Sequence, residues 1–111
     1  MVRESTSAIV GRNEIWRSDF ATEPYEAGWA GELVLFVRAL EAGGADGVEA
    51  RVQISPDGMH WVDEGTRLTL PSRKDAIGYA RIAHFGNWVR LVGTLPDGAA
   101  LKIIVTIHAK A

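Results

Sequence analysis

The stretch VEARVQISPDGMHW, residues 48–61, decides the fold class because it contains a strand, a turn and the start of a second strand. Apolar and polar side chains alternate strictly in residues 48–54. This period of two predicts a β-strand with one buried face. Pro56, Asp57 and Gly58 then form a turn, because Pro presets its own φ and Gly accepts a positive φ. The chain is therefore expected to fold back on itself as an antiparallel hairpin.

A three-residue loop in this hairpin pairs Val52 with Val62 and Arg51 with Asp63. The second pair joins opposite charges across the strands, which is favourable by up to about 1 kcal/mol. In this register Trp61 lies on the outer face of the sheet. A change of one residue in the loop would instead send Trp61 into the core, because successive side chains point to opposite faces.

The alternation continues after residue 32 and predicts an all-β chain. ELVLFVRAL, residues 32–40, is nearly continuous in apolar residues, as expected for a strand in the middle of a sandwich. Further strands are expected at residues 13–18, 60–64, 66–70, 76–85, 88–95 and 101–109. We predict one antiparallel β-sandwich domain over residues 1–111, with seven or eight strands and jelly-roll or Greek-key connections. Residues 1–31 are expected to form an irregular N-terminal segment that packs on this sandwich or on a neighbouring subunit.

Two further turn signals predict that residues 76–109 form a three-stranded meander. Gly86-Asn87 is a two-residue hairpin signal, and LPDGA, residues 95–99, repeats the Pro-Asp-Gly turn. Counting outward from these turns brings apolar residues onto one face, which we expect in the core. The members of this face are Ala80, Ile82, Val89, Leu91, Ile103, Val105 and Ile107.

The opposite face of this meander is richer in apolar and aromatic residues than a solvated sheet face should be. Its members are Tyr79, Arg81, Ala83, Phe85, Trp88, Arg90, Val92, Lys102, Ile104 and Thr106. Three interpretations remain open. The N-terminal segment covers the face, or a second subunit does so with aromatic and arginine anchors. Alternatively, Trp88 stacks on a sugar ring or base while Arg81 or Arg90 binds an anion.

Composition excludes several classes of function. The 111 residues carry 12 Lys+Arg against 14 Asp+Glu, a net charge of -2, so bulk charge does not drive binding to nucleic acid or to a membrane. There is no cysteine for disulfides or thiolate chemistry. The sequence shows no signal peptide and no apolar run long enough to cross a membrane. We therefore expect a protein of the cytoplasm or of an assembled particle.

The polar residues do not predict catalysis. His60, His84 and His108 lack partners at metal-ligand spacing. Asp63 and Glu64 are adjacent, so on a strand they point to opposite faces and cannot form a carboxylate pair. The serines lack a glycine-rich elbow, and the Asp-Gly pairs are typical of turns rather than of calcium loops. We expect no metal, no cofactor and no enzymatic activity.

Two motifs carry a family resemblance. The first is Ser-x-Asp-Gly-x-x-Trp at residues 55–61, and the second is the aromatic-x-Arg pattern of Trp88 and Arg90 within YARIAHFGNWVRLVG. Together they resemble the discoidin β-sandwich family, whose domains are longer, contain cysteines and bind glycans or lipids through loops at one end. Ser-x-Asp-Gly-x-x-Trp is also similar to segments of small β-sandwich proteins that serve as structural modules of phages and virus-like particles, and the compact, cysteine-free chain suits this second resemblance better. The second resemblance implies an assembly role.

These observations favour a non-catalytic structural subunit that self-associates, or binds another structural protein, through a sheet face, in a virus-like, phage-derived or other protein shell. The residues predicted to form its interface are Tyr79, Arg81, Phe85, Trp88, Arg90 and Ile104. The alternative function is that of a carbohydrate-binding module. Its glycan would contact Asp57, Trp61 and Trp88.

Overall fold

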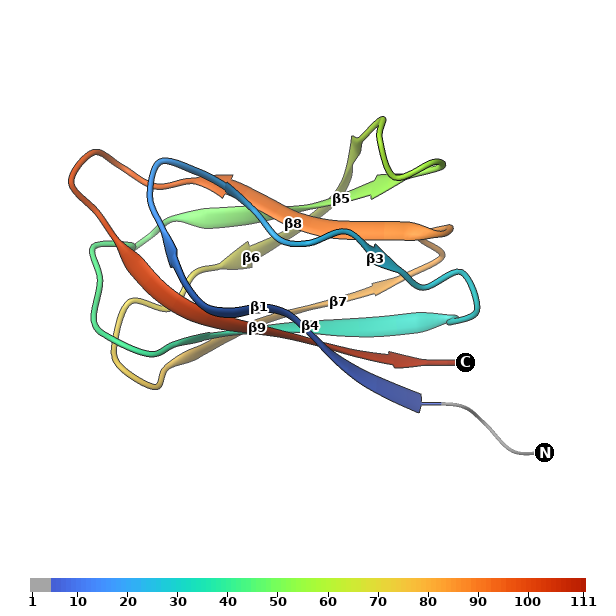
Figure 1. Ribbon diagram of the computed structural model, residues 1–111, viewed down its shortest axis with the longest axis horizontal. Helices are drawn as coiled ribbons and strands as arrows, with labels where there is room; N and C mark the ends of the chain where they lie inside the picture. The colour runs from blue at the N-terminus through green and yellow to red at the C-terminus, as the bar shows by residue number, and fades with distance from the viewer. Residues whose placement is uncertain (1–4) are drawn as a thin grey trace.

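The computed structural model describes residues 5–111, which form two antiparallel β-sheets packed face to face and contain no helix (Figure 1). The expected antiparallel β-sandwich is therefore confirmed. The strands are β1 (Ser5–Trp16), β2 (Asp19–Ala21), β3 (Tyr25–Glu26), β4 (Glu32–Ala39), β5 (Glu49–Ser55), β6 (Val62–Thr69), β7 (Ile77–Ala83), β8 (Trp88–Thr94) and β9 (Leu101–Lys110). We call the sheet with strand order β1-β9-β4-β7 sheet A. Sheet B has the order β2-β8-β5-β6, and β3 also pairs with β8.

The predicted meander is wrong, because the chain changes sheet at each of the two turns. β7 lies in sheet A, β8 in sheet B and β9 again in sheet A, so no two of these strands pair. Gly86 and Gly98 have φ of 78° and 83°, as expected of turn glycines. A turn between sheets uses the same residues as a hairpin turn, so the local sequence does not distinguish the two.

The expected core residues are nevertheless buried, because a residue facing inward from either sheet meets the same core. Val89, Leu91, Ile103, Val105 and Ile107 are fully buried, and Ala80 and Ile82 are 5% exposed. The other large contributions come from the inward residues of β4, β5 and β6, namely Leu33, Leu35, Val37, Val52 and Leu68. Burying one such aliphatic side chain stabilises the fold by about 1.5–3 kcal/mol.

The N-terminal segment is more regular than expected and does not cover a sheet face. β1 begins at Ser5 rather than near residue 13, and it pairs along β9 at the edge of sheet A. The chain then crosses to sheet B, where β2 and β3 pair with β8. Trp16 and Phe20 stack at the crossing with ring centroids 4.0 Å apart. Residues 1–4 of this segment lie outside the described range.

The β5–β6 hairpin forms as expected, but its loop is two residues longer. Ile54, not Val52, pairs with Val62, and Gln53 pairs with Asp63. Arg51 still reaches Asp63, with its Nε 3.4 Å from Oδ1. A shift of two residues preserves the facing of every side chain, so Trp61 stays on the outer side of sheet B.

Candidate functional site

The structure divides the six predicted interface residues between two opposite surfaces. Tyr79, Arg81 and Ile104 lie on the outer face of sheet A, whereas Trp88 and Arg90 lie on the outer face of sheet B. They cannot form the single patch that the meander implied.

Phe85 lies on neither surface, because it is buried with 3% of its area exposed. Strand β7 ends at Ala83, and His84 then takes a positive φ of 55°. This left-handed residue breaks the alternation and turns Phe85 inward. Its assignment to an interface is therefore wrong.

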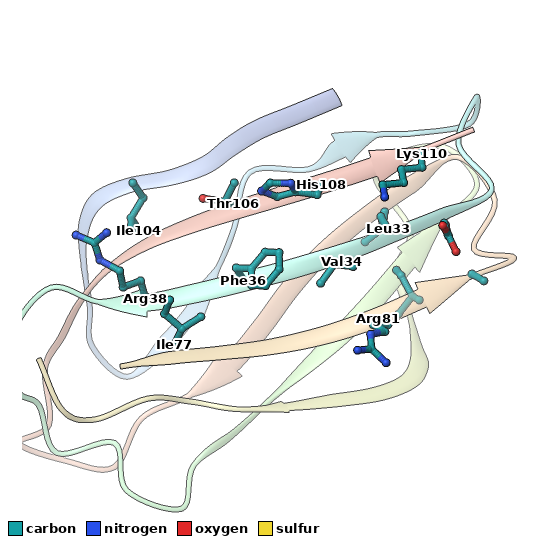
Figure 2. Close-up of a pocket in the computed structure, with 13 residues that line it drawn as sticks. Leu33, Val34, Phe36, Arg38, Ile77, Arg81, Ile104, Thr106, His108 and Lys110 are labelled. Atoms are coloured by element: carbon teal, nitrogen blue, oxygen red, sulfur yellow. The ribbon is translucent and has the colours of Figure 1, made fainter. Parts of the chain in front are cut away.

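The outer face of sheet A is hollowed by a shallow groove of about 800 Å³ that runs along β4 between β7 and β9 (Figure 2). The outward residues of β4 form its floor: Glu32, Val34, Phe36 and Arg38. Ile77 and Arg81 come from β7, and Ile104, Thr106, His108 and Lys110 come from β9. Three strands thus contribute to one elongated depression.

Phe36 lies at the centre of this groove and is half-buried. Its ring packs against Tyr79 at a centroid distance of 6.3 Å and edge-on against His108 at 5.3 Å. Around it the face is unusually apolar, since Ile77 is 58% exposed and Tyr79 is 56% exposed. Exposed apolar groups gathered in this way mark an interaction surface more often than a solvated one.

The sequence of β4 itself indicates that one of its faces points outward. The nearly continuous apolar stretch at residues 32–40 predicted a strand in the middle of a sandwich, but Glu32 and Arg38 share their facing with Val34 and Phe36. A charged residue at each end of an alternating set shows that this set points outward.

Charged residues occupy both ends of the groove. At one end, Glu32 of β4 is paired with Ala83 of β7 and with Lys110 of β9. Arg81 lies nearby on β7, with its guanidinium over the Tyr79 ring at 5.5 Å. At the other end the Arg38 Nε lies 3.7 Å from the Asp75 carboxylate. The Arg38–Asp75 pair is exposed, so it contributes at most about 1 kcal/mol to stability.

A different arrangement covers the outer face of sheet B. The Arg90 guanidinium stacks over the Trp61 ring at 4.2 Å, and its Nε and Nη2 both donate to Gln53 Oε1, at 2.9 and 2.8 Å. Gln53 in turn donates to Asp63 at 2.9 Å. Desolvation by burial lowers the pKa of Arg90, while the hydrogen bond from Gln53 is the largest of the causes that lower the pKa of Asp63.

The Ser-x-Asp-Gly-x-x-Trp motif forms a tightly bonded turn that projects from the end of this sheet (Figure 1). The Ser55 hydroxyl is buried and accepts hydrogen bonds from the amides of Asp57 and Gly58. Asp57 Oδ1 accepts hydrogen bonds from the amides of His60 and Met59, which hold the pKa of its carboxyl far below the ordinary value. Gly58 packs so closely on the Trp88 indole that an added Cβ would lie 3.2 Å from the ring.

Asp57, Trp61 and Trp88 are thus gathered at one end of the outer face of sheet B. These side chains already have contacts within the chain. Asp57 accepts hydrogen bonds from its own turn, the Trp61 ring stacks with Arg90, and Gly58 packs on the Trp88 indole. The motif is explained by the stability of this turn.

The three histidines make different contacts. The His60 ring bonds to Asp57, His84 follows the end of β7 with a positive φ, and the His108 ring packs against Phe36. Within residues 5–111 no three His, Asp or Glu side chains gather closely enough to hold a metal ion. None of the described segments forms a helix with the length and apolarity needed to span a membrane.

No protein-family model matches the sequence, and no curated protein sequence matches it either. Among solved structures, the fold is similar to that of the SPBc2 prophage-derived protein YomS, with a TM-score of 0.66 and 10% identity over 100% of this chain and 96% of that chain. A second similar structure is CpGH89CBM32-5 from Clostridium perfringens in complex with GalNAc-β-1,3-galactose, with a TM-score of 0.47 and 14% identity over 93% of this chain and 94% of that chain. The likeness to YomS, which is prophage-derived, supports the expected β-sandwich fold.

Proposed function

We propose that the protein is a non-catalytic assembly subunit that associates with copies of itself through the outer face of sheet A. The observation that carries this proposal is the apolar groove centred on Phe36, with Ile77 and Tyr79 exposed beside it. The setting we propose is a phage-derived particle or another protein shell, which suits the fold shared with YomS.

The occupant we propose is a second copy of this chain, because the face offers complementary halves. Its β4 strand has an acidic residue, Glu32, at one end and a basic residue, Arg38, at the other. A symmetric pair of such faces places each Glu32 against an Arg38, whose contact within its own chain is the exposed 3.7 Å one with Asp75. One patch used by each copy is enough to close an oligomer. An unrelated partner would need its own matching pattern.

The expected association is weak. Three strands about 4.8 Å apart and about eight residues long present a face of roughly 15 by 25 Å. This is smaller than a standard protein interface, which covers about 800 Å² on each partner. We therefore expect a dissociation constant on the order of 10 µM.

Sedimentation equilibrium from about 5 µM to about 500 µM tests the proposal. The wild-type protein should change from monomer to oligomer in this range, and Phe36→Asp should raise the dissociation constant at least about tenfold, because it places a charge in an apolar contact. Met59→Asp is the matched control, since Met59 is 74% exposed on the turn of sheet B. A wild-type protein that stays monomeric throughout, or a folded Phe36→Asp variant that associates normally, would overturn the proposal.

Glycan binding is a second candidate function, favoured by the position of Trp61 and Trp88 on one face beside Arg90. Aromatic side chains stack on the apolar faces of sugar rings. A glycan array in which hits disappear with Trp61→Ala would support this function. An array without hits, or with hits that the substitution leaves unchanged, would remove it.

A further inference from the structure

The outward residues of β4 have a pattern that reverses in sign from one end to the other. Reading along the strand, they are acidic Glu32, apolar Val34, apolar Phe36 and basic Arg38. Leu35, at the middle of this pattern, points into the core and is paired with Ala80 of β7 and Ile107 of β9. The level of Leu35 is therefore the centre of symmetry of the face.

Two copies that pack with these faces together have two simple choices of two-fold axis. An axis parallel to β4 puts each residue of β4 opposite itself, so Glu32 meets Glu32 and Arg38 meets Arg38. The same axis brings β7 over β9, which places Arg81 against His108. The facing pairs Glu32–Glu32 and Arg38–Arg38 are like charges, which destabilise a contact, so this arrangement is disfavoured.

An axis that crosses the strands reverses β4 and gives opposite charges. Residues equally far from the level of Leu35 then meet, so Glu32 lies against Arg38 and Val34 against Phe36. β7 faces its own copy, which brings Arg81 over Tyr79.

We propose that the protein forms a two-fold dimer whose axis crosses the strands of sheet A at the level of Leu35, with Glu32 of each subunit against Arg38 of the other. This inference rests on the proposed function and adds the symmetry and register of the contact. In such an interface every contact occurs twice, so a few complementary pairs specify the whole arrangement.

Cysteine cross-linking tests the register without background, because the chain contains no cysteine. Glu32→Cys and Arg38→Cys are prepared separately, and each sample, as well as their mixture, is treated with a bis-maleimide that spans the roughly 10 Å between packed sheets. Met59→Cys, on the turn of sheet B, measures collisional cross-linking. The mixture should give a cross-linked dimer between positions 32 and 38, while each variant alone should stay at the Met59→Cys level.

The outcomes separate the register from the function. If Glu32→Cys and Arg38→Cys each cross-link to themselves, the axis runs along the strands, and the register is wrong while the face is right. If no sample cross-links above the control although sedimentation shows an oligomer, the outer face of sheet A is not the interface, and both proposals fall.

Charge reversal gives a second, independent reading. Under the proposed register, Glu32→Arg and Arg38→Glu each turn two attractions into repulsions, and each should weaken association several-fold. The double variant Glu32→Arg with Arg38→Glu restores both pairs and should associate more tightly than either single variant, since the loss of the Arg38–Asp75 contact is common to it and to Arg38→Glu. Single variants that associate with unchanged affinity would contradict the register, because an axis along the strands keeps like charges together in either case.

Discussion

At the scale of the residue, Asp57 shows how a recognition-like motif serves the fold. Its carboxylate accepts the amides of Met59 and His60 and lies 2.6 Å from the His60 ring, while Ser55 holds the other side of the turn. An ionised carboxylate accepts such hydrogen bonds better than a protonated one. The turn should therefore be most stable when Asp57 is charged.

Replacing Asp57 with Asn should make the free energy of unfolding depend less on pH in acid. The pKa of Asp57 is lowered in the folded protein, so its stabilising contribution is complete above the unfolded pKa and is lost as the pH falls toward the folded pKa. Asn keeps an oxygen for the Met59 and His60 amides but cannot titrate.

Urea unfolding between about pH 6 and about pH 2 checks this prediction. The unfolding midpoint of the wild type should fall more steeply below about pH 4 than that of Asp57→Asn, and the two curves should approach each other in acid. Asp63 titrates in both proteins, so its effect on the unfolding midpoint cancels in the comparison. Parallel curves over the whole range would show that the charge of Asp57 does not stabilise the turn.

At the scale of the element, β8 organises sheet B because β2, β3 and β5 all pair with it. Phe20 of β2 lies directly over Gly93 of β8, and a Cβ at Gly93 would come within 2.6 Å of the Phe20 ring. Phe20 also stacks on the Trp16 ring. The absence of a side chain at Gly93 thus lets the N-terminal segment cross between the sheets.

Gly93→Ala should destabilise the protein by about 1–3 kcal/mol, because the extra methyl group overpacks the Phe20 ring. Gly31→Ala is the matched control, since the nearest neighbour of its added Cβ would be a backbone atom of Ala111 at 3.8 Å. Its free energy of unfolding should stay within about 0.5 kcal/mol of the wild type. Chemical denaturation of the three proteins gives the comparison. Equal stabilities would mean that Phe20 moves aside without loss.

Elements with a clear alternation were predictable, and their partners were not. Residues 48–54 showed their strand and its buried face directly, because the period of two follows from backbone geometry. The predicted outward facing of Phe85 was wrong because the alternation of side chains does not reveal the positive φ of His84. The predicted start of β1 was wrong because the pairing of β1 with β9 is interrupted by register shifts near Val10 and Asn13, which disturb the alternation of its side chains.

At the scale of the whole molecule, the sequence does not show which of the two sheets each strand joins. Alternation states whether a side chain faces the core, and both sheets share one core, so the expected core residues were right although their pairing was wrong. A surface depends on strand order as well. The predicted patch therefore split into a sheet A part with Tyr79, Arg81 and Ile104 and a sheet B part with Trp88 and Arg90.

The most direct test of self-association through sheet A is a methyl NMR dilution series from about 1 mM to about 10 µM. The methyl signals of Val34, Ile77 and Ile104 should shift with concentration, because these side chains face the second copy. The signals of Met59 and Val62, which are exposed at the hairpin of sheet B, should stay constant. Signals from sheet A that do not move, or movement confined to sheet B, would contradict the proposed assembly.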